Sequence, residues 1–196
     1  PAHFMPGILA QLKEKATAKF QEMRLDFDEV TSLGTPRRTA LLVKNLAETQ
    51  QGASSEYKGP STAIVFDKDG NPTKAAIGFA RGKKVDVADL VVKDGYVYAV
   101  SSEEGKQTVE LLPTLLKELV EGLNFPKNMR WGDLDFRFVR PLRWLVALYD
   151  EEVIDFTVAN VTSGRVSRGH RFLSEGDFTI NKASDYEQAC KDAFII

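Results

Sequence analysis

The sequence predicts an α+β fold, and three observations point to this class. Apolar residues recur at helical spacing over residues 6–23 and 109–123, which indicates two amphipathic helices. The first of these helices is followed directly by two strand-like segments. Apolar and polar residues alternate over residues 153–159, as they do in a strand that buries one face.

Residues 1–49 are predicted to form half of a ferredoxin-like unit, in the order helix, strand, strand. The strands lie near residues 27–33 and 40–46, and residues 34–38 join them. The strand that would precede the helix is missing. The chain also lacks a starting methionine and ends on apolar residues after Cys190. We therefore expect a fragment of a longer protein.

Residues 50–132 are predicted to form an inserted α+β unit. Its first part, residues 50–61, is polar, contains Gly52, Gly59 and Pro60, and is typical of a linker. A dense turn signal at residues 67–72 separates a short strand from a helix that Thr73 can cap. The expected elements are a strand at 63–66, a helix at 73–80, a hairpin of strands at 90–92 and 96–100, and the helix at 109–123, whose Pro113 is acceptable only in the first turn.

Residues 133–196 are predicted to be a β-rich part that completes the first domain and is truncated at its end. Segments 144–149 and 153–159 flank an acidic turn at residues 150–152 and indicate a C-terminal β-hairpin region. Because β patterning brackets the helix-rich middle, we expect these strands to share one sheet with the strand near residues 38–46.

Composition excludes several classes of protein. The formal net charge is −2, so nucleic acid would have to bind a local basic surface rather than the field of the whole molecule. The single cysteine, Cys190, permits no intramolecular disulfide, which fits a reducing cytoplasm. No apolar run approaches the ~20 residues that span a bilayer. We expect a soluble cytoplasmic protein that makes no membrane contact.

Catalytic templates find no match along the chain. Gly78, Gly82 and Gly95 fit neither a Walker A loop nor a dinucleotide-binding fingerprint. His3 and His170 lie far apart in sequence, and no cluster of cysteine and histidine has the spacing of metal ligands. No nucleophile elbow accompanies His170. The sequence therefore predicts no catalytic residue, no bound cofactor and no metal site in this chain.

Arginines are concentrated in the last third of the chain. Seven of the 11 arginines lie at or after Arg130. Five basic residues and two acids occupy residues 127–143, and residues 160–173 hold three arginines, one histidine and no acid. Guanidinium groups suit phosphate contacts, and an aromatic ring nearby offers a stacking face to a base. The candidate RNA-binding residues are Arg37, Arg38, Lys127, Arg130, Trp131, Arg137, Arg140, Arg168, His170 and Arg171.

A structural explanation of the same arginines stays open at this point. Arg137, Arg140 and Arg143 would then cover the outer side of a β-edge, or pair with Asp133 or Asp135 in a partly buried network. Loss of an arginine from such a network would lower the stability of the fold by a few kcal/mol. Loss of a phosphate contact would instead lower RNA affinity.

Six short segments, spread in order from one end of the chain to the other, form a specific pattern. They are GTPRR at 34–38, KGP at 58–60, PTKAA at 72–76 with GFAR at 78–81, FPKNMRWG at 125–132, RFVRPLRW at 137–144 and GHRF at 169–172. In this order they resemble the β subunit of the heterotetrameric bacterial glycyl-tRNA synthetase. Residues 1–5 also resemble those just after the first strand in that family, which explains the missing strand. Thr39 departs from the family pattern, where a larger aliphatic residue is expected.

The resemblance implies an α₂β₂ aminoacyl-tRNA synthetase that ligates glycine to its tRNA using ATP. It implies a catalytic centre in the α subunit, which binds glycine, ATP and Mg²⁺, and a tRNA-binding role for the β subunit. An HD-like domain and an anticodon-binding domain of the β subunit would lie beyond the end of this chain. The implied partners are therefore the α subunit and tRNA.

Three functions remain open. The favoured one is a non-catalytic, tRNA-binding part of the ligase. The second is a scaffold that docks the α subunit and uses its arginines structurally. The third is a hydrolytic domain that acts on charged tRNA through His170. In the first case His170 would add positive charge to the RNA-binding surface in mildly acidic solution.

Overall fold

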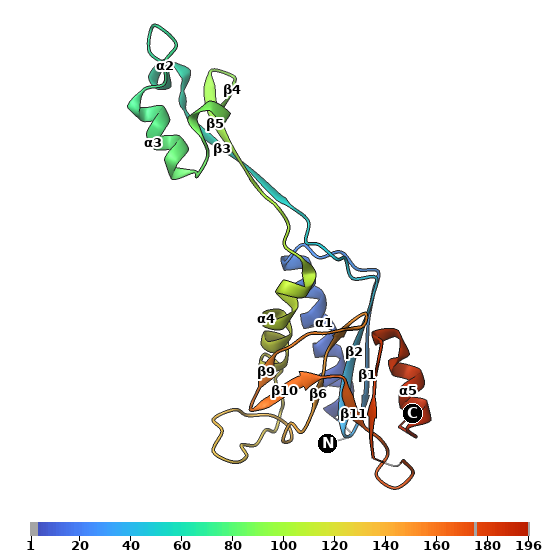
Figure 1. Cartoon of the computed structure of the whole chain (residues 1–196). Helices are drawn as coiled ribbons and strands as arrows, with labels where there is room; N and C mark the ends of the chain where they lie inside the picture. Colours follow the sequence, from blue (N-terminus) through green and yellow to red (C-terminus); the bar gives the residue numbers. More distant parts are fainter. Residues whose placement is uncertain (1–3, 175, 196) are drawn as a thin grey trace. The chain divides into compact units, whose positions relative to one another are not determined.

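The chain folds into two compact units, the second of which is an insertion in the first (Figure 1). The computed structural model describes residues 4–174 and 176–195. The main unit holds the described residues up to Gln50 and those from Lys106 onward, and the insertion holds residues 51–105. Helices and strands are mixed in both, which confirms the α+β class. None of the described helices is long and apolar enough to cross a membrane.

The main unit begins with the predicted order of helix, strand and strand. Helix α1, Met5–Glu22, carries a proline in its first turn and buries one apolar face. Strand β1, Glu29–Thr35, pairs antiparallel with β2, Arg38–Lys44. Thr35 lies opposite Arg38, so a two-residue loop closes the hairpin and places Arg38 at the start of β2.

Helix α4, Thr108–Glu121, packs with α1 in the core of the main unit. Its buried Leu112, Leu115 and Leu119 join Phe20 of α1 in one hydrophobic cluster. Pro113 lies in the second turn of α4 and not, as predicted, in the first. A proline there removes one backbone hydrogen bond. The helix tolerates this because burying each leucine contributes about 1.5–3 kcal/mol.

The rest of the main unit is built from short strands. β6, Leu145–Val146, pairs in parallel with β10, Val161–Gly164, whose other edge pairs antiparallel with β9, Thr157–Val158. β7, Leu148–Tyr149, and β8, Glu152–Val153, form a hairpin that is shorter than the predicted one. β11, Val166–Arg168, pairs antiparallel with β12, Asp177–Thr179. The turn η3, Ala183–Asp185, and helix α5, Tyr186–Asp192, complete the unit.

The expectation that the two strand groups share one sheet is wrong. β1 and β2 form a sheet of their own, separate from the strands of residues 144–159. The reason is clearest at Ala147, whose backbone N–H donates to Gly164 while its carbonyl accepts from Ile154. The strands of residues 145–158 pair with β10 and with one another, and in the described sheets none of them pairs with β1 or β2.

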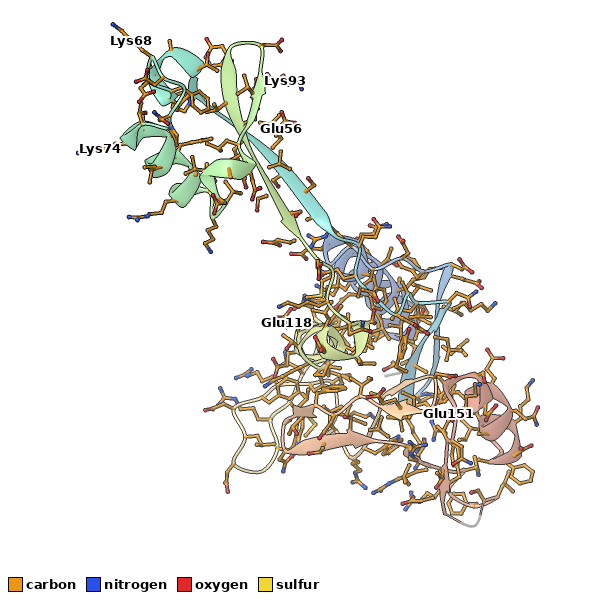
Figure 2. The ribbon with its side chains drawn as sticks, turned by 45° about the horizontal axis from the view of Figure 1, so that its top comes forward. Glu56, Lys68, Lys74, Lys93, Glu118 and Glu151 are labelled. Carbon is orange, nitrogen blue, oxygen red and sulfur yellow. The ribbon has the colours of Figure 1, made fainter. Side chains whose placement is uncertain are left out.

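The insertion is a three-stranded sheet with helices on one face. β3, Ala53–Ser61, and β4, Val91–Lys93, pair antiparallel with the two edges of β5, Tyr96–Glu103, which confirms the predicted β4–β5 hairpin. Helices α2, Thr62–Val65, and α3, Lys74–Gly82, and the turn η2, Val87–Asp89, surround a small core of Val65, Ala76 and Val97. On the other face, Lys93 of β4 lies 3.8 Å from Glu56 of β3 (Figure 2).

Two segments of the insertion differ from the prediction. Residues 50–61, predicted as a linker, mostly form β3, because even a polar segment becomes a strand when β5 supplies its hydrogen-bond partners. Gly59 is required in it, since a Cβ atom there would lie 2.6 Å from the ring of Phe79. Residues 63–66, predicted as a strand, lie largely in the one-turn helix α2, whose Val65 is buried. So short an apolar run does not distinguish a strand from a buried helical turn.

The insertion ends well before residue 132. Helix α4 belongs to the main unit, because its leucines are buried against α1. The two residues of the main unit that flank the insertion are hydrogen-bonded to each other. Gln50 donates its backbone N–H to the Lys106 carbonyl at 2.9 Å, and Lys106 donates its backbone N–H to Gln50 Oε1 at 3.3 Å. Thr49 and Gln107 form an antiparallel bridge next to them. We propose that residues 51–105 are a separate domain whose removal leaves the main unit closed.

Excision of the insertion tests this division. In the test variant Asn-Gly replaces residues 51–105, because a two-residue loop of this type closes paired antiparallel ends. We expect a cooperative thermal transition to persist in circular dichroism, since the core of the main unit contains no residue of the insertion. In the control, the same loop replaces residues 51–112, which deletes Leu112 from the core and should abolish the transition. Loss of the transition in the first variant would contradict the division.

Candidate functional site

The candidate basic side chains lie mainly at three places on the main unit. The first is the Trp144 cluster, which we define as Arg38, Arg143, Trp144, Arg165, Arg168 and Asp177. The second is the loop of residues 127–143, and the third is the turn of residues 169–174 after β11. Nine of the ten sequence candidates lie in these places. The tenth, Arg37, is exposed in the loop between β1 and β2.

Arg38 is half-buried and links two distant parts of the main unit. Its Nη2 donates a hydrogen bond of 2.7 Å to the carbonyl oxygen of Arg168. Its Nε and Nη1 are buried without a hydrogen-bond partner in the part of the chain that the structure describes. The guanidinium carbon lies 5.7 Å from the centre of the Trp144 ring, and such a cation–π contact contributes about 0.5–2 kcal/mol. Arg38 therefore contributes to the fold as well as to the charge of the cluster.

Arg168 covers the same indole from the end of β11. Its guanidinium carbon lies 5.3 Å from the centre of the Trp144 ring. Its Nε lies 3.7 Å from the carboxylate of Asp177 on the paired strand β12, and both side chains are about half exposed, at 47% and 58%. An ion pair this exposed contributes only ~0–1 kcal/mol. Asp177 therefore restrains the guanidinium group of Arg168 only weakly.

Arg165 is a fixed cation in the wall of the cluster. Its Nη1 donates to the carbonyl of Asn181 at 3.1 Å, and its Nη2 donates to the carbonyl of Glu151 at 2.9 Å. Glu151 lies in the turn between β7 and β8 (Figure 2), so one guanidinium joins that turn to the segment after β12. Both acceptors are neutral, and the positive charge therefore persists at this position.

A shallow depression of about 230 Å³ lies among these side chains. Arg143, Trp144, Arg165, Arg168 and Asp177 line it, together with residues of β6 and β10. Three guanidinium groups face one carboxylate, so the local charge is positive although the whole chain carries −2. The combination of cations and an indole suits an anionic ligand with a flat ring.

Aromatic rings hold the loop of residues 127–143 against the main unit. Phe136 stacks on Phe138 with ring centres 5.8 Å apart, and Trp131 meets Phe136 edge-on at 5.9 Å. Phe138 contacts Phe125 at 4.4 Å and packs against the core. Trp131 is half-buried in this stack, so its ring has a structural role beside any contact with a base.

The basic residues of this loop lie on its outside. Lys127, Arg137 and Arg140 are exposed, and among the described residues Arg137 and Arg140 make no ion pair and no side-chain hydrogen bond. Arg130 lies 3.5 Å from Asp135 in a pair whose side chains are 54% and 99% exposed. The partly buried network that would make Arg137 and Arg140 structural is therefore not formed by the described residues.

His170 organises the turn after β11. Its Nδ1 accepts hydrogen bonds from the backbone N–H groups of Phe172 and Leu173, both at 3.3 Å. The backbone N–H of His170 donates to the Ala193 carbonyl at 2.9 Å. Both hydrogen bonds close the backbone of the turn on the imidazole. The imidazole thus stabilises a turn.

The tip of the same turn is exposed and partly apolar. Gly169 permits the turn, since a Cβ atom there would lie 1.8 Å from Ser174 Oγ. Arg171 is exposed, and its guanidinium carbon lies 5.6 Å from the centre of the Phe172 ring. Phe172 and Leu173 are 82% and 62% exposed. The turn therefore presents one cation and two large apolar side chains to solvent.

A half-buried phenol, that of Tyr186, lies near Arg38. Burial raises the pKa of Tyr186, the neighbouring Cys190 raises it further, and the charge of Arg38 opposes these effects. Arg38, Tyr186 and Cys190 line a cavity of about 20 Å³. The phenol therefore stays protonated at neutral pH and supplies no negative charge to Arg38.

Comparisons with known proteins point to one family. Residues 1–196 match the family described as "Glycyl-tRNA synthetase beta subunit". Proteins named glycine–tRNA ligase beta subunit from Desulfitobacterium hafniense strain Y51, Desulforamulus reducens and Natranaerobius thermophilus are 48%, 44% and 42% identical to this chain. Each alignment covers 100% of this chain but only 29% of the relative.

These matches define the class of the protein as that of aminoacyl-tRNA synthetase subunits. Within this class, the chain belongs to the family of glycyl-tRNA synthetase β subunits. It spans a little under a third of the length of the relatives that it matches, 29%.

The contrast between fixed and free arginines predicts different effects on stability. Arg165→Ala leaves two carbonyl groups without their charged donor, so we expect the free energy of unfolding to fall by about 1–3 kcal/mol. Arg137→Ala, the matched control, removes an exposed side chain that makes no bond among the described residues, and should change it by less than about 0.5 kcal/mol. Urea unfolding of both variants measures the difference. Equal losses in the two would contradict the assignment.

Proposed function

We propose that this chain is a non-catalytic, tRNA-binding part of a glycine–tRNA ligase, a cytoplasmic enzyme that joins glycine to its tRNA with ATP. Its proposed partners are tRNA and the α subunit, in an α₂β₂ assembly. Family membership supports the enzyme. The observation that carries the tRNA-binding role is the exposure of Arg137 and Arg140, without a counter-charge among the described residues, on a loop held by aromatic packing.

The proposed contact is electrostatic and directed at the RNA backbone. Residues 127–143 carry five basic residues against two acids, and residues 160–173 carry three arginines and no acid. Neutralising phosphates releases counterions, which gives affinity that falls steeply with salt. Such contacts position an RNA without selecting its sequence. The selection of the glycine tRNA would then come from other parts of the enzyme.

The aminoacylation chemistry is proposed to take place in the α subunit. Among the described residues, no three histidine, cysteine, aspartate or glutamate side chains converge as metal ligands would. We assign no step through Mg²⁺–ATP to these residues. His170 is engaged in its own turn, which also disfavours hydrolysis of charged tRNA through it.

Docking of the α subunit is a second candidate function, and one observation favours it. Phe172 and Leu173 are large, apolar and exposed at a turn tip, and exposed apolar side chains next to a cation are common in protein interfaces. In this alternative the loop of residues 127–143 would contact protein rather than RNA.

Salt-dependent tRNA binding by the complete enzyme separates the two candidates. We expect Arg137→Ala and Arg140→Ala each to weaken tRNA binding, and to reduce the slope of log affinity against log salt by roughly 0.7–0.9 units per lost contact. Lys117→Ala, which removes an exposed cation on α4, is the control and should leave the slope unchanged.

Melting temperature and subunit association are recorded for the same variants. Neither should change, because Arg137 and Arg140 make no bond among the described residues. Unchanged tRNA affinity together with weaker association of the subunits would reject the RNA-binding role and support docking.

A further inference from the structure

The Trp144 cluster has features that a backbone-binding surface does not need. A surface that only neutralises phosphates requires cations, whereas this depression also contains an indole and a carboxylate. Trp144 is half-buried, and the guanidinium carbons of Arg38 and Arg168 lie 5.7 and 5.3 Å from its ring centre. Of these two arginines, Arg168 lines the depression and Arg38 does not.

Asp177 argues against a simple anion as the ligand. Its carboxylate lines the depression and is 58% exposed, and it would repel an inorganic phosphate. A carboxylate is useful where the ligand carries N–H or O–H donors, as the base and ribose of a nucleotide do. The volume of about 230 Å³ is smaller than that of drug-sized pockets, which begin at roughly 300 Å³, and is on the scale of one nucleotide.

The cations are distributed as one nucleotide would require. Arg143 is exposed at the rim, and Arg165 is fixed in the wall by two carbonyl oxygens. Both can attract a phosphate, one by contact and one through its field. Arg168 offers its guanidinium plane, backed by Trp144, as a stacking surface for a base.

We propose that this depression binds a single unpaired nucleotide of an RNA chain. The base stacks on the layer formed by Arg168 and Trp144, the phosphate meets Arg143 near Arg165, and Asp177 accepts a hydrogen bond from the base or the ribose. The inference rests on the proposed tRNA-binding function and adds to it a pocket for a nucleotide that is not base-paired. Stacking on every base is possible at such a surface, so the site selects unpaired structure before sequence.

Two RNAs test the proposal in the complete enzyme: tRNA, and a blunt-ended duplex of equal charge that has no unpaired nucleotide. Trp144→Ala should weaken tRNA binding by about 5- to 150-fold, the range of one lost base stack, and leave duplex binding unchanged. Trp144→Phe should restore most of the loss. Tyr96→Ala is the matched control, since Tyr96 is an exposed aromatic residue beside a cation, Lys58, in the insertion and outside the depression. If Trp144→Ala weakened the binding of tRNA and of the duplex equally, the proposal would be overturned.

Asp177→Ala supplies a second test, in which the affinities for the two RNAs should change in opposite directions. This test does not depend on the folding of the Trp144 variants. Removal of a negative charge should tighten binding of the duplex slightly, whereas loss of the acceptor should weaken binding of tRNA. Tighter binding of both tRNA and the duplex to this variant would overturn the proposal. Adenosine monophosphate, the free-nucleotide probe, should bind weakly, and a loss of its binding in Trp144→Ala with unchanged tRNA affinity would reject RNA as the source of the nucleotide.

Failure of the nucleotide site is distinguishable from failure of the proposed function. If only the nucleotide site is wrong, tRNA binding keeps its dependence on Arg137 and Arg140 while Trp144→Ala affects both RNAs alike or neither. If the tRNA-binding function is wrong, the dependence on Arg137 and Arg140 is absent as well.

Discussion

The hydrogen bond from Arg38 Nη2 to the carbonyl of Arg168 joins residues that lie 130 positions apart. It connects the start of β2 to the end of β11 and brings both guanidinium groups to the ring of Trp144. Two cations near one indole repel each other, and the backbone bond together with the π face offsets that repulsion. The Trp144 cluster depends on this connection, because it holds the first hairpin against β11 beside Trp144.

The arginines of this chain perform two different tasks, and their environment separates them. Arg165 donates to two carbonyls and holds a turn, and Arg38 is half-buried with two nitrogen atoms removed from solvent. Arg137 and Arg140 are exposed beside inward-packed rings and keep their hydrogen-bonding capacity for a ligand. A fixed cation sets the local potential, and a free one makes the contact. A surface that contains both fixed and free cations is preorganised for an anion. The ion pairs within this surface, such as that of Arg168 with Asp177, are weak.

Local patterns in the sequence predict much of this fold, and long-range pairing limits the rest. Helices α1, α3 and α4 and the β1–β2 and β4–β5 hairpins follow from periodicity and turn residues. The sheet assignments of residues 144–159 do not. Ala147 bonds to Gly164 through its N–H and to Ile154 through its carbonyl, and no local pattern encodes this pair of partners. The polar strand β3 forms only because β5 lies beside it. The boundary at Lys106 likewise depends on where the leucines of α4 pack.

The same limit applies to the site. The density of arginine after residue 130 predicts a basic surface, and the segment at 137–144 contains both the loop arginines and Trp144. The sequence does not reveal that Arg165 donates its hydrogen bonds to backbone carbonyl groups, or that Asp177 lines the depression. Both facts arise from the pairing of β11 with β12 and from the turn at Glu151. His170, a candidate for RNA contact or catalysis by residue type, is instead seen to cap a turn through its Nδ1.

Site-specific photocrosslinking tests the central claim, that the outer side of the loop of residues 127–143 meets tRNA. A benzophenone amino acid placed at Arg140 in the complete enzyme is irradiated in the presence of tRNA, with the same group at Lys117 on α4 as the control. We expect a crosslink to tRNA from position 140 that high salt abolishes, and none from position 117. A crosslink from position 140 to the α subunit, or equal yields of tRNA crosslink from both positions, would contradict it.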